Sequence, residues 1–481
     1  MKFSPTPSIQ DLGHVHFIGI GGAGMSAIAR ILLARSVAVS GSDARDSNAL
    51  RQLAGLGATV HVGHSAEYAA TADTVVVSTA IREDNPEFRA AAGAGLPIIH
   101  RSQALAAAME GKQIIAVAGT HGKTTTTAMI TVMLHQAGLD PSFAVGGDVA
   151  ALGVNAAHGK GRFFVAEADE SDGSFLNYRP AIAVVTNVEP DHLDYYGSAS
   201  AVYSAFDGFV DRLPASGTLV ACADDDGAMQ LVARMRDRFR DGGEDSAPVV
   251  LTYGYSESAD VRITAESAED RTSTSTLEFL VDGSPQQQPL SLAVPGKHNV
   301  LNAAAAFAVG LRAGVEPAPA ASGLSAFSGA SRRFEFKGEA NGVRVFDDYA
   351  HHPTEVLAAL TAARTVAGGN RVHVLFQPHL FSRTKEFAPE FASALALADT
   401  VSVLDIYPAR EDPIEGVTSR LIADRIGDDA YQPDPGNAAA HVAARAHPGD
   451  IILTVGAGDV TGYGPEILAN LGKGTEADNG N

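Results

Sequence analysis

The stretch Gly119-Thr120-His121-Gly122-Lys123-Thr124-Thr125 follows an apolar run over residues 113–118 and leads into a threonine-rich helical pattern. A strand, a glycine-rich turn and a helix in this order form a phosphate cradle, because glycines let backbone N–H groups approach the anion and the helix N-terminus adds positive potential. Lys123 places an ammonium on the terminal phosphates, and a threonine hydroxyl after such a lysine usually binds Mg²⁺. The spacing departs from the common G-x-x-x-x-G-K-[ST] pattern, since residue 117 is Val. The stretch predicts an ATP-type site.

Apolar strands and helical patterns alternate on both sides of this turn. Residues 14–18 lead into a helix with Met25, Ile28, Ile31 and Leu32 on one face. Strand, helix and strand in sequence predict parallel sheets with crossover helices. The other predicted strands are residues 37–40, 74–78, 97–99, 113–118, 162–166, 182–186, 217–221, 343–346, 372–376, 400–404 and 451–455.

One later segment has an apolar period of two instead of a helical period. Two short runs alternate apolar and other residues around the turn Asp282-Gly283, which predicts an antiparallel hairpin attached to the α/β core. The alternating apolar residues are Leu277, Phe279 and Val281 in the first run and Leu290, Leu292 and Val294 in the second. A helix is expected over residues 302–311.

The length of 481 residues suggests about three domains, at roughly 100–200 residues each. The expected domains are residues 1–111, 112–328 and 329–481. The first boundary is placed at the change of pattern near Glu110-Gly111, and the second after the Pro- and Ala-rich stretch that precedes Gly329. The polar residues 241–248 are predicted to form a loop, and the last ten residues are predicted to fray.

Composition favours a large acidic enzyme of the cytoplasm. The net charge of −21 disfavours binding to a nucleic-acid backbone, which needs clustered basic groups. The single cysteine, Cys222, cannot form an internal disulfide, which fits a reducing compartment. No uninterrupted apolar run reaches the about 18 residues of a membrane span, and the N-terminus has no signal-peptide pattern.

Two polar segments follow strands close to the phosphate cradle in sequence. The acidic stretch over residues 167–172 follows the strand 162–166, and it suits a hard cation such as Mg²⁺, which prefers oxygen ligands. Residues 186–194 follow the next strand and include His192, which is either a metal ligand, a phosphate contact or a structural residue. Neither HExxH nor paired CxxC spacing occurs, so a zinc site is not expected.

The glycines of the first domain match the dinucleotide pattern G-x-G-x-x-G at Gly19, Gly21 and Gly24. Asp43 lies 19 residues after Gly24, where an acid can meet a ribose hydroxyl. The pattern alone suggests a nicotinamide dehydrogenase, but the same physics binds any ribose diphosphate, including a UDP-sugar. It therefore predicts a nucleotide diphosphate and leaves its identity open.

Polar segments of the last third predict a further ligand site. Residues 347–354 and 377–384 each follow a predicted strand, and Arg383 can clamp a carboxylate or a phosphate. Arg332-Arg333 adds two guanidinium groups near a domain boundary. Asn299, in a loop that opens an alanine-rich helix, either recognises a base edge or caps that helix.

The ordered combination of these segments resembles the Mur ligase family from about Val15 to Asp459. The family implies three α/β domains: an N-terminal Rossmann-like domain for a UDP-sugar, a central P-loop-type ATPase domain with the added antiparallel element, and a C-terminal Rossmann-like domain that closes the site and binds the amino acid. The glycine stretch 19–26 narrows the resemblance to the first ligase of the pathway. The stretches that carry the resemblance are residues 19–26, 119–125, 167–172, 187–192, 295–300, 347–353 and 376–379.

The resemblance implies an ATP-driven ligase of peptidoglycan precursor synthesis. L-alanine would be joined to the lactyl carboxylate of UDP-N-acetylmuramate through an acyl phosphate, giving ADP and phosphate. The implied cofactors are ATP and two Mg²⁺ ions, and the implied partners are UDP-N-acetylmuramate, L-alanine and ATP, with no nucleic acid and no membrane insertion. The chain is expected to be a cytoplasmic monomer or weak homodimer.

The resemblance also implies a role for each matching residue. Lys123, Glu167, His192, His351 and Arg383 would be catalytic, and Thr124, Glu167 and His192 would hold the metal. ATP would contact Gly119, Thr120, His121, Gly122, Lys123, Thr124, Thr125, His298 and Asn299, with Arg332 or Arg333 on the phosphates. The UDP-sugar would contact Gly19, Gly21, Gly22, Gly24, Met25, Ser26, Asp43 and Ser78. The amino acid would contact Tyr349, His351 and Arg383. Leu380 departs from some relatives, which carry arginine there.

Three alternatives remain at this point. A murein tripeptide ligase of the same family uses the same sugar but attaches a ready-made peptide, and the glycine-rich loop from Gly19 to Met25 speaks against it. An NAD-dependent oxidoreductase leaves the Lys123 loop unexplained. A regulatory nucleotide-binding module without catalysis does not account for Lys123, Glu167 and His192 together.

Overall fold

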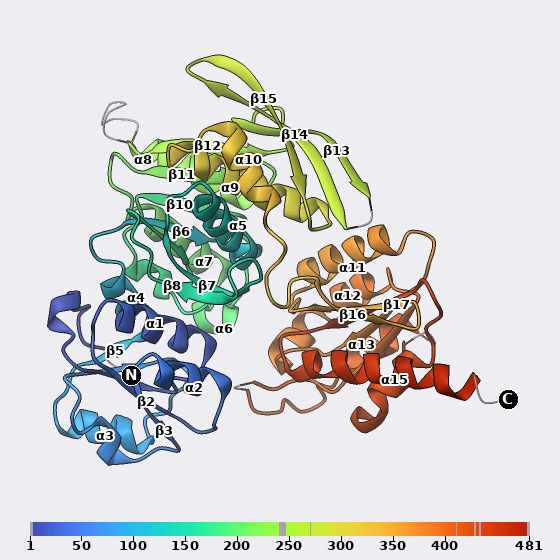
Figure 1. The fold of residues 1–481 in the computed structure, drawn as a ribbon, viewed down its shortest axis with the longest axis horizontal. Coiled ribbons are helices and arrows are strands. Elements are labelled where there is room, and N and C mark those ends of the chain that lie inside the picture. The colour runs from blue at the N-terminus through green and yellow to red at the C-terminus, as the bar shows by residue number, and fades with distance from the viewer. Residues whose placement is uncertain are drawn as a thin grey trace. The chain divides into compact units, whose positions relative to one another are not determined.

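The computed structural model describes residues 3–239, 247–269, 271–409, 411–427, 430–431 and 434–478, and in these residues the chain forms three β-sheets (Figure 1). Two compact units are present. The first comprises Met1–Ala265, Ser275–Ser291 and Leu301–Phe327, and the second comprises Glu266–Thr274, Leu292–Val300 and Ser328–Asn481. Residues 241–246 of the predicted loop lie outside the described residues.

The first sheet has the strand order β3-β2-β1-β4-β5, and all its neighbours pair in parallel. This confirms the predicted parallel sheet, with one strand added. Strand β3 was not predicted, and none of its four residues, two polar and two valines, is buried. The strands are β1 (Val15–Ile18), β2 (Val39–Asp43), β3 (Thr59–Val62), β4 (Thr74–Val77) and β5 (Ile98–His100). The α-helices are α1 (Ala23–Ala34), α2 (Asn48–Gly55), α3 (Pro86–Gly93) and α4 (Arg101–Ala108), with 3₁₀ turns at Ile9–Asp11 and Ala66–Ala69.

Strand β2 lies later in the sequence than the apolar pattern predicted, because buried polar side chains continue it. Ser40 and Ser42 are buried on β2, and their hydroxyls have partners. Ser40 Oγ lies 2.8 Å from His16 Nδ1, and Ser42 Oγ donates to Glu87 Oε2 at 2.7 Å. The strand predicted over residues 37–40 therefore begins two residues too early and ends three residues too early.

Glu87 is the centre of this buried network. Its carboxylate, fully buried at the start of α3, lies 2.6 Å from His16 Nε2 and 2.8 Å from His64 Nδ1. Burial alone would raise the pKa of Glu87, but the hydrogen bonds from His16, Ser42 and His64 lower it below its usual value. One ionised carboxylate thereby joins β1, β2 and α3.

The second sheet has the order β15-β14-β13-β12-β11-β10-β6-β9-β7-β8. Its centre pairs in parallel from β12 to β7, and β8 is antiparallel to β7. The strands are β6 (Gln113–Ala118), β7 (Ser142–Val149), β8 (Val154–Ala157), β9 (Phe163–Glu167), β10 (Ile182–Val185), β11 (Thr218–Cys222), β12 (Val249–Gly254), β13 (Val261–Glu269), β14 (Thr272–Val281) and β15 (Ser284–Leu292).

The predicted strands of this sheet are confirmed, as is the hairpin. Strands β14 and β15 are neighbours joined through Asp282 and Gly283. Strands β7, β8, β12 and β13 were not predicted. The helices are α5 (Lys123–Gln136), α6 (Leu193–Tyr196), α7 (Ala199–Val210), α8 (Asp226–Phe239), α9 (Lys297–Arg312) and α10 (Pro317–Ser325), with a 3₁₀ turn at Ser174–Asn177.

One apolar core runs through the first and second sheets. It contains Ile31 and Met109 next to the first sheet and Phe164 and Phe206 next to the second, all essentially inaccessible to solvent. Helix α1 contacts both β7 and β8. Cys222, at the end of β11, is buried, and burial raises the pKa of its thiol to about 11.

The third sheet belongs to the second unit and has the order β16-β17-β21-β18-β19-β20. All neighbours are parallel except β16, an antiparallel edge strand that was not predicted. The strands are β16 (Glu335–Ala340), β17 (Val343–Asp348), β18 (Val372–Phe376), β19 (Thr400–Val403), β20 (Ala430–Tyr431) and β21 (Ile451–Val455).

Helices surround this sheet, and the last one extends into the segment that was predicted to fray. The helices are α11 (Pro353–Ala367), α12 (Phe381–Leu395), α13 (Arg420–Ile426), α14 (Ala438–Ala443) and α15 (Tyr463–Asp478), with 3₁₀ turns at Pro435–Asn437 and Asp459–Gly462. Ile467 and Leu471 of α15 are buried in an apolar cluster with Val343 and Val345 of β17. These contacts hold the part of α15 that precedes Gly472, and residues 479–481 lie outside the described residues.

Removing the Glu87 carboxylate is expected to destabilise the first sheet. Glu87→Ala leaves His16 and Ser42 buried without their acceptor, and breaking a buried pair from one side typically costs about 3–5 kcal/mol. The measurement is urea or thermal unfolding near neutral pH. Because the folded-state pKa of Glu87 is lowered, its contribution is present above the ordinary value of 4.5 and is lost as pH falls through the folded-state value.

The matched control is Glu67→Ala, since Glu67 is exposed on the same domain. That variant should change stability by less than about 0.5 kcal/mol. Equal stability of the two variants at neutral pH would contradict a structural role for the buried carboxylate.

Candidate active site

The glycine turn that was predicted to cradle phosphate connects β6 to α5. Gly119 (φ 137°) and Gly122 (φ 81°) both occupy the positive-φ region, and Gly122 is the N-cap of α5. A Cβ on Gly119 would lie 2.0 Å from Thr186 Oγ1, so only glycine fits this turn. The side chains of Thr120, Thr124 and Thr125 are buried beside it.

Lys123 is held at the first turn of α5 by three groups. Its Nζ donates to the carbonyl oxygens of Gly119 at 2.6 Å and Thr120 at 3.1 Å, and it lies 2.8 Å from Glu170 Oε2. Burial alone would lower the pKa of Lys123, but Glu170 and Asp169 raise it above its usual value. The lysine therefore carries a positive charge at physiological pH.

The acidic segment after β9 gives each carboxylate a different partner. Glu167 accepts hydrogen bonds from Thr124 Oγ1 at 3.0 Å and from the Gly146 backbone N–H at 2.7 Å. Asp169 pairs with Arg101 at 2.8 Å, and Glu170 pairs with Lys123. Burial would raise the pKa of Asp169, but Arg101 and Lys123 lower it strongly.

His192 lies beside Glu170, so the two polar segments that follow β9 and β10 meet at one place. It is the N-cap of the short helix α6 and has a positive φ of 56°. Its Nε2 lies 3.5 Å from Glu170 Oε1 and 3.6 Å from Asp191 Oδ2. Burial would lower the pKa of His192, but the hydrogen bond to Glu170 and the charge of Asp191 raise it.

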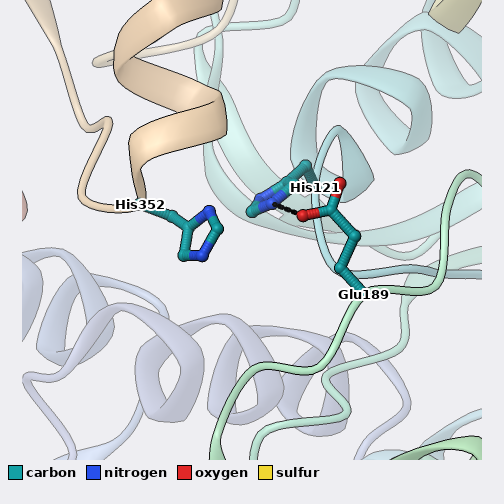
Figure 2. A group of neighbouring side chains, drawn as sticks. All are labelled: His121, Glu189 and His352. Carbon is teal, nitrogen blue, oxygen red and sulfur yellow. Dashed lines mark ion pairs between the residues drawn. The ribbon is translucent and has the colours of Figure 1, made fainter. Parts of the chain in front are cut away.

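His121 and Glu189 form a second pair near the cradle. Figure 2 shows the two side chains turned toward each other, and His121 Nε2 lies 3.6 Å from Glu189 Oε2. The backbone N–H of His121 donates to Asn187 Oδ1 at 2.8 Å. The loop after β10 is thereby attached to the glycine turn, which brings two of the predicted segments together.

The glycine loop of the first sheet precedes helix α1. The Gly21 backbone N–H donates to Asp43 Oδ2 at 3.0 Å, and a Cβ on Gly21 would lie 2.9 Å from that oxygen. Asp43 thus fixes the glycine loop through this hydrogen bond. The other predicted residues lie around this contact: Gly19, Gly22 and Gly24 in the loop and first turn, Met25 and Ser26 buried in α1, and Ser78 directly after β4.

Three consecutive residues at the junction of β5 and α4 contact the segment from Asp169 to Asn177 that follows β9. His100 Nε2 lies 3.6 Å from Asp172, Arg101 pairs with Asp169, and Ser102 Oγ accepts from Asn177 Nδ2 at 2.8 Å. Sequence reasoning gave none of these three residues a role, although they follow the predicted strand 97–99 as the other polar segments follow theirs.

His298 and Asn299 begin helix α9 and belong to the second unit. Burial, with the nearby charge of Arg333, lowers the pKa of His298 to about 4, so this ring is neutral at physiological pH. Asn299 is buried, and its Nδ2 donates to Pro295 O at 2.6 Å. The amide therefore fixes the turn before the helix from within its first turn, by donating to a carbonyl instead of accepting backbone N–H groups as an N-cap does, so the capping interpretation of Asn299 is not borne out.

The two adjacent arginines differ in their surroundings. Arg332 (φ 59°) donates to Gly456 O at 2.5 Å and to Asp347 Oδ2 at 3.3 Å, so it joins two strand ends of the third sheet. Arg333 Nη1 lies 4.0 Å from Glu355 Oε1. Both guanidinium groups lie over the ring of Tyr349, at 4.8 Å and 5.3 Å from its centroid.

Asp348 was quoted within a predicted segment but received no role. Its carboxylate accepts from the backbone N–H groups of Phe334 and Ala350, each at 2.8 Å. Burial raises the pKa of Asp348 to about 6, against the opposing charge of Arg333. Asp348 thereby fixes the turn that carries Tyr349.

The remaining predicted residues of the third sheet meet at the strand ends. His351 Nδ1 lies 3.1 Å from Tyr349 O and 3.3 Å from Glu355 Oε2. The rings of His351 and His379 are 5.7 Å apart, and Arg383, buried in α12, has Nη1 3.4 Å from His379 Nδ1. Leu380 is the N-cap of α12, with a positive φ of 71°, and is buried.

Comparison with known proteins identifies matches along nearly the whole chain. Residues 14–113 match the catalytic domain of the Mur ligase family, residues 117–310 match the Mur ligase middle domain, and residues 332–458 match the Mur ligase glutamate ligase domain.

Curated relatives and solved structures give the same result. The chain is 62% identical to the UDP-N-acetylmuramate–L-alanine ligase of Renibacterium salmoninarum, covering 96% of this chain and 97% of that protein. It is 52% identical to the ligase of the same name from Thermobifida fusca, covering 96% and 98%. The crystal structure of UDP-N-acetylmuramate-alanine ligase from Thermotoga maritima has a TM-score of 0.79 at 30% identity, with 96% and 99% covered. A murein peptide ligase from Psychrobacter arcticus has a TM-score of 0.70 at 26% identity, with 96% and 99% covered.

His351 is expected to remain neutral well below the usual range of histidine. Burial, with the charges of Arg383 and His379, lowers its pKa to about 3, although Glu355 opposes the shift. Nitrogen-15 NMR of histidine-labelled protein should show a neutral ring at His351 from about pH 7.5 to pH 5, assigned with a His351→Asn variant. Because the unfolded chain binds this proton more readily, stability falls as pH drops below 6.5. A ring that titrates near 6.5 would contradict the prediction.

Proposed function

We propose, for a chain that belongs to the Mur ligase family, the ATP-dependent joining of L-alanine to the lactyl carboxylate of UDP-N-acetylmuramate. The product is UDP-N-acetylmuramoyl-L-alanine, with ADP and phosphate released, and the reaction belongs to peptidoglycan precursor synthesis. The observation that carries the proposal is the 52–62% identity, over nearly full length, to relatives named for this reaction. The murein tripeptide alternative is less favoured, since the solved alanine ligase has a TM-score of 0.79, against 0.70 and 0.57 for the solved murein peptide ligases.

The three-domain division of the sequence supports a division of labour. In this proposal residues 1–111 bind the UDP-sugar, residues 112–328 bind ATP, and residues 329–481 bind the amino acid and close the site. The glycine loop before α1, the cradle before α5 and the strand ends of the third sheet are the corresponding places in the fold.

Lys123 offsets the electrostatic repulsion that opposes the first step of the reaction. The sugar carboxylate attacks the γ-phosphorus of ATP, the bond to the bridging oxygen breaks, and ADP leaves with that electron pair. An anion approaching a polyanion is repelled, and a charged ammonium fixed at the helix N-terminus stabilises the transferring phosphoryl group. The contacts of Lys123 with Gly119 O and Glu170 support this role, because they fix its position before ATP binds.

Thr124 and Glu167 suit a magnesium ion. Their oxygens lie 3.0 Å apart at the start of α5, and a hydroxyl with a carboxylate is the ligand chemistry that Mg²⁺ prefers when phosphates complete its shell. When bound there, the ion would neutralise charge on the phosphates. Hydrogen bonds from Thr124 and Gly146 orient the Glu167 carboxylate in advance.

His192 is proposed as the ligand of a second ion, with less support from its surroundings. A metal binds only the neutral imidazole, whereas Glu170 and Asp191 raise the pKa of His192 and favour the protonated ring. Such an ion would have to displace this proton. A protonated His192 would instead contact phosphate directly as a donor.

The remaining ATP contacts are assigned on chemistry. His298 is neutral and suits stacking against adenine, with Asn299 beside it. Arg333 is proposed as the phosphate contact instead of Arg332, because Arg332 already joins Gly456 and Asp347, whereas the ion pair of Arg333 with Glu355 is long.

Tyr349, His351 and Arg383 are proposed for the incoming amino acid, whose amine attacks the acyl carbonyl before phosphate leaves. The Nδ1–H of His351 can donate to Tyr349 O, which makes Nε2 the acceptor. With its pKa lowered to about 3, the ring is too weak a base to deprotonate an ammonium group. His351 would therefore orient the amine by accepting a hydrogen bond, and Arg383 would bind the carboxylate.

The proposed setting is the cytoplasm, for a monomer or weak homodimer that binds no nucleic acid. The net charge of −21 supports the last point. Within the described residues, none of the helices has both the length and the apolarity that crossing a membrane requires.

Phosphate release from ATP and Mg²⁺ tests the function directly. Release is expected only with UDP-N-acetylmuramate and L-alanine together, since both acyl transfer partners are needed for turnover. Single L-amino acids and the murein tripeptide are supplied as alternative amines. Release with the tripeptide alone would assign the recycling reaction instead, and no release with any amine would refute the ligase.

Lys123→Ala is expected to lower kcat by about a thousandfold or more, because the transferring phosphoryl group loses its fixed ammonium. Circular dichroism should remain that of the wild type. The matched control is Lys160→Ala, since Lys160 is exposed and should be dispensable. Equal kcat values for the two variants would exclude Lys123 from phosphate binding.

A further inference from the structure

The end of β5 joins the proposed sugar site to the proposed ATP site. His100, Arg101 and Ser102 are consecutive, and each contacts the segment from Asp169 to Asn177 that follows β9. That segment also carries Glu170, the partner of Lys123. A displacement of Arg101 would therefore be transmitted to the residues that hold the ATP lysine.

Arg101 also reaches the glycine loop on its other side. Its Nη1 lies 3.3 Å from the position that a Cβ on Gly24 would occupy, in the first turn of α1. A guanidinium next to a helix N-terminus is electrostatically unfavourable unless an anion lies close to both. Asp169, 2.8 Å away, supplies one negative charge and ties the guanidinium to the acidic segment through an ion pair.

The Arg101–Asp169 pair is accessible enough to exchange partners. About a quarter of the Arg101 side chain and a third of the Asp169 side chain are exposed. An incoming anion with two or more oxygens matches the planar fork of a guanidinium better than a single carboxylate oxygen does. A UDP-sugar carries such oxygens in its diphosphate and, in UDP-N-acetylmuramate, also in its lactyl carboxylate.

We propose that Arg101 binds an anionic group of the UDP-sugar and, through Asp169, couples occupancy of the sugar site to the ATP site. This inference rests on the proposed function, because it takes the glycine loop as the sugar site. Arg101 is a binding residue for the sugar nucleotide and a positioning residue for the loop that holds Lys123. Binding of either nucleotide then changes the affinity for the other by the same factor.

Calorimetric titration separates the two anionic groups without turnover. The ligands are UDP, UDP-N-acetylglucosamine and UDP-N-acetylmuramate, of which only the last has the carboxylate. Arg101→Ala should raise the Kd of UDP-N-acetylmuramate about 10- to 100-fold, as expected for a lost charged hydrogen bond. An equal loss for all three ligands assigns the diphosphate, and a loss for UDP-N-acetylmuramate alone assigns the carboxylate.

Matched variants distinguish binding from folding. Arg101→Lys keeps the charge but not the fork, and it should recover part of the affinity. Arg51→Ala removes an exposed arginine of the same domain, whose ion pair with Asp46 is largely solvent-accessible, and it should bind as the wild type does. If Arg101→Ala does not fold, Arg101→Gln replaces it.

The coupling is measured with a non-hydrolysable ATP analogue, with and without UDP-N-acetylmuramate. The wild type should bind the analogue more tightly in the presence of the sugar nucleotide, and both Arg101→Ala and Asp169→Asn should reduce that ratio toward one. In steady-state assays Arg101→Ala should raise KM for the sugar nucleotide more than KM for ATP.

Two results would overturn the inference and are distinguishable from failure of the proposed function. Kd values for all three ligands within about twofold of the wild type in Arg101→Ala would exclude the binding role. An unchanged coupling ratio in both variants would exclude the coupling role. Wild-type protein that binds none of the three nucleotides would refute the proposed function itself, and the inference with it.

Discussion

The turn between β6 and α5 is the constraint on which the rest of the site depends. Gly119 passes so close to Thr186 that a side chain could not fit, and this closeness joins the glycine turn to the loop after β10. Thr186 Oγ1 and Asn187 Nδ2 both donate to His121 O, at 2.5 Å and 3.1 Å. The position of Lys123 at the head of α5 follows from these contacts, as do the positions of the carboxylates around it.

Charge is arranged so that Arg101 and Lys123 each face a carboxylate of the acidic segment. Arg101 pairs with Asp169 and Lys123 with Glu170, while Glu167 is held by neutral donors, Thr124 and the Gly146 backbone. An acidic protein that binds anionic nucleotides needs this kind of local compensation, because its overall field repels them.

Sequence patterns predicted the parallel cores of the sheets well, because buried apolar runs at strand positions follow a simple rule. The glycine turn before α5 was also predicted, because glycine, lysine and threonine at this spacing between a strand and a helix are typical of a phosphate-binding loop. Strand β2 was misplaced because Ser40 and Ser42 depend on His16 and Glu87, which are distant in sequence. Arg101 was missed as well: its partner lies 68 residues away, and no local pattern indicates such a pair. The roles assigned to His298, Arg333, Tyr349 and Arg383 remain predictions.

The burial of Cys222 has a practical consequence for labelling studies of the two units in solution. With its thiol pKa raised to about 11, the native cysteine is almost entirely protonated and shielded from reagents at neutral pH. A cysteine introduced at an exposed position on each unit would therefore be labelled selectively in the natural sequence background. Fluorescent dyes attached in this way would report the distance between the units in solution, with each substrate added in turn.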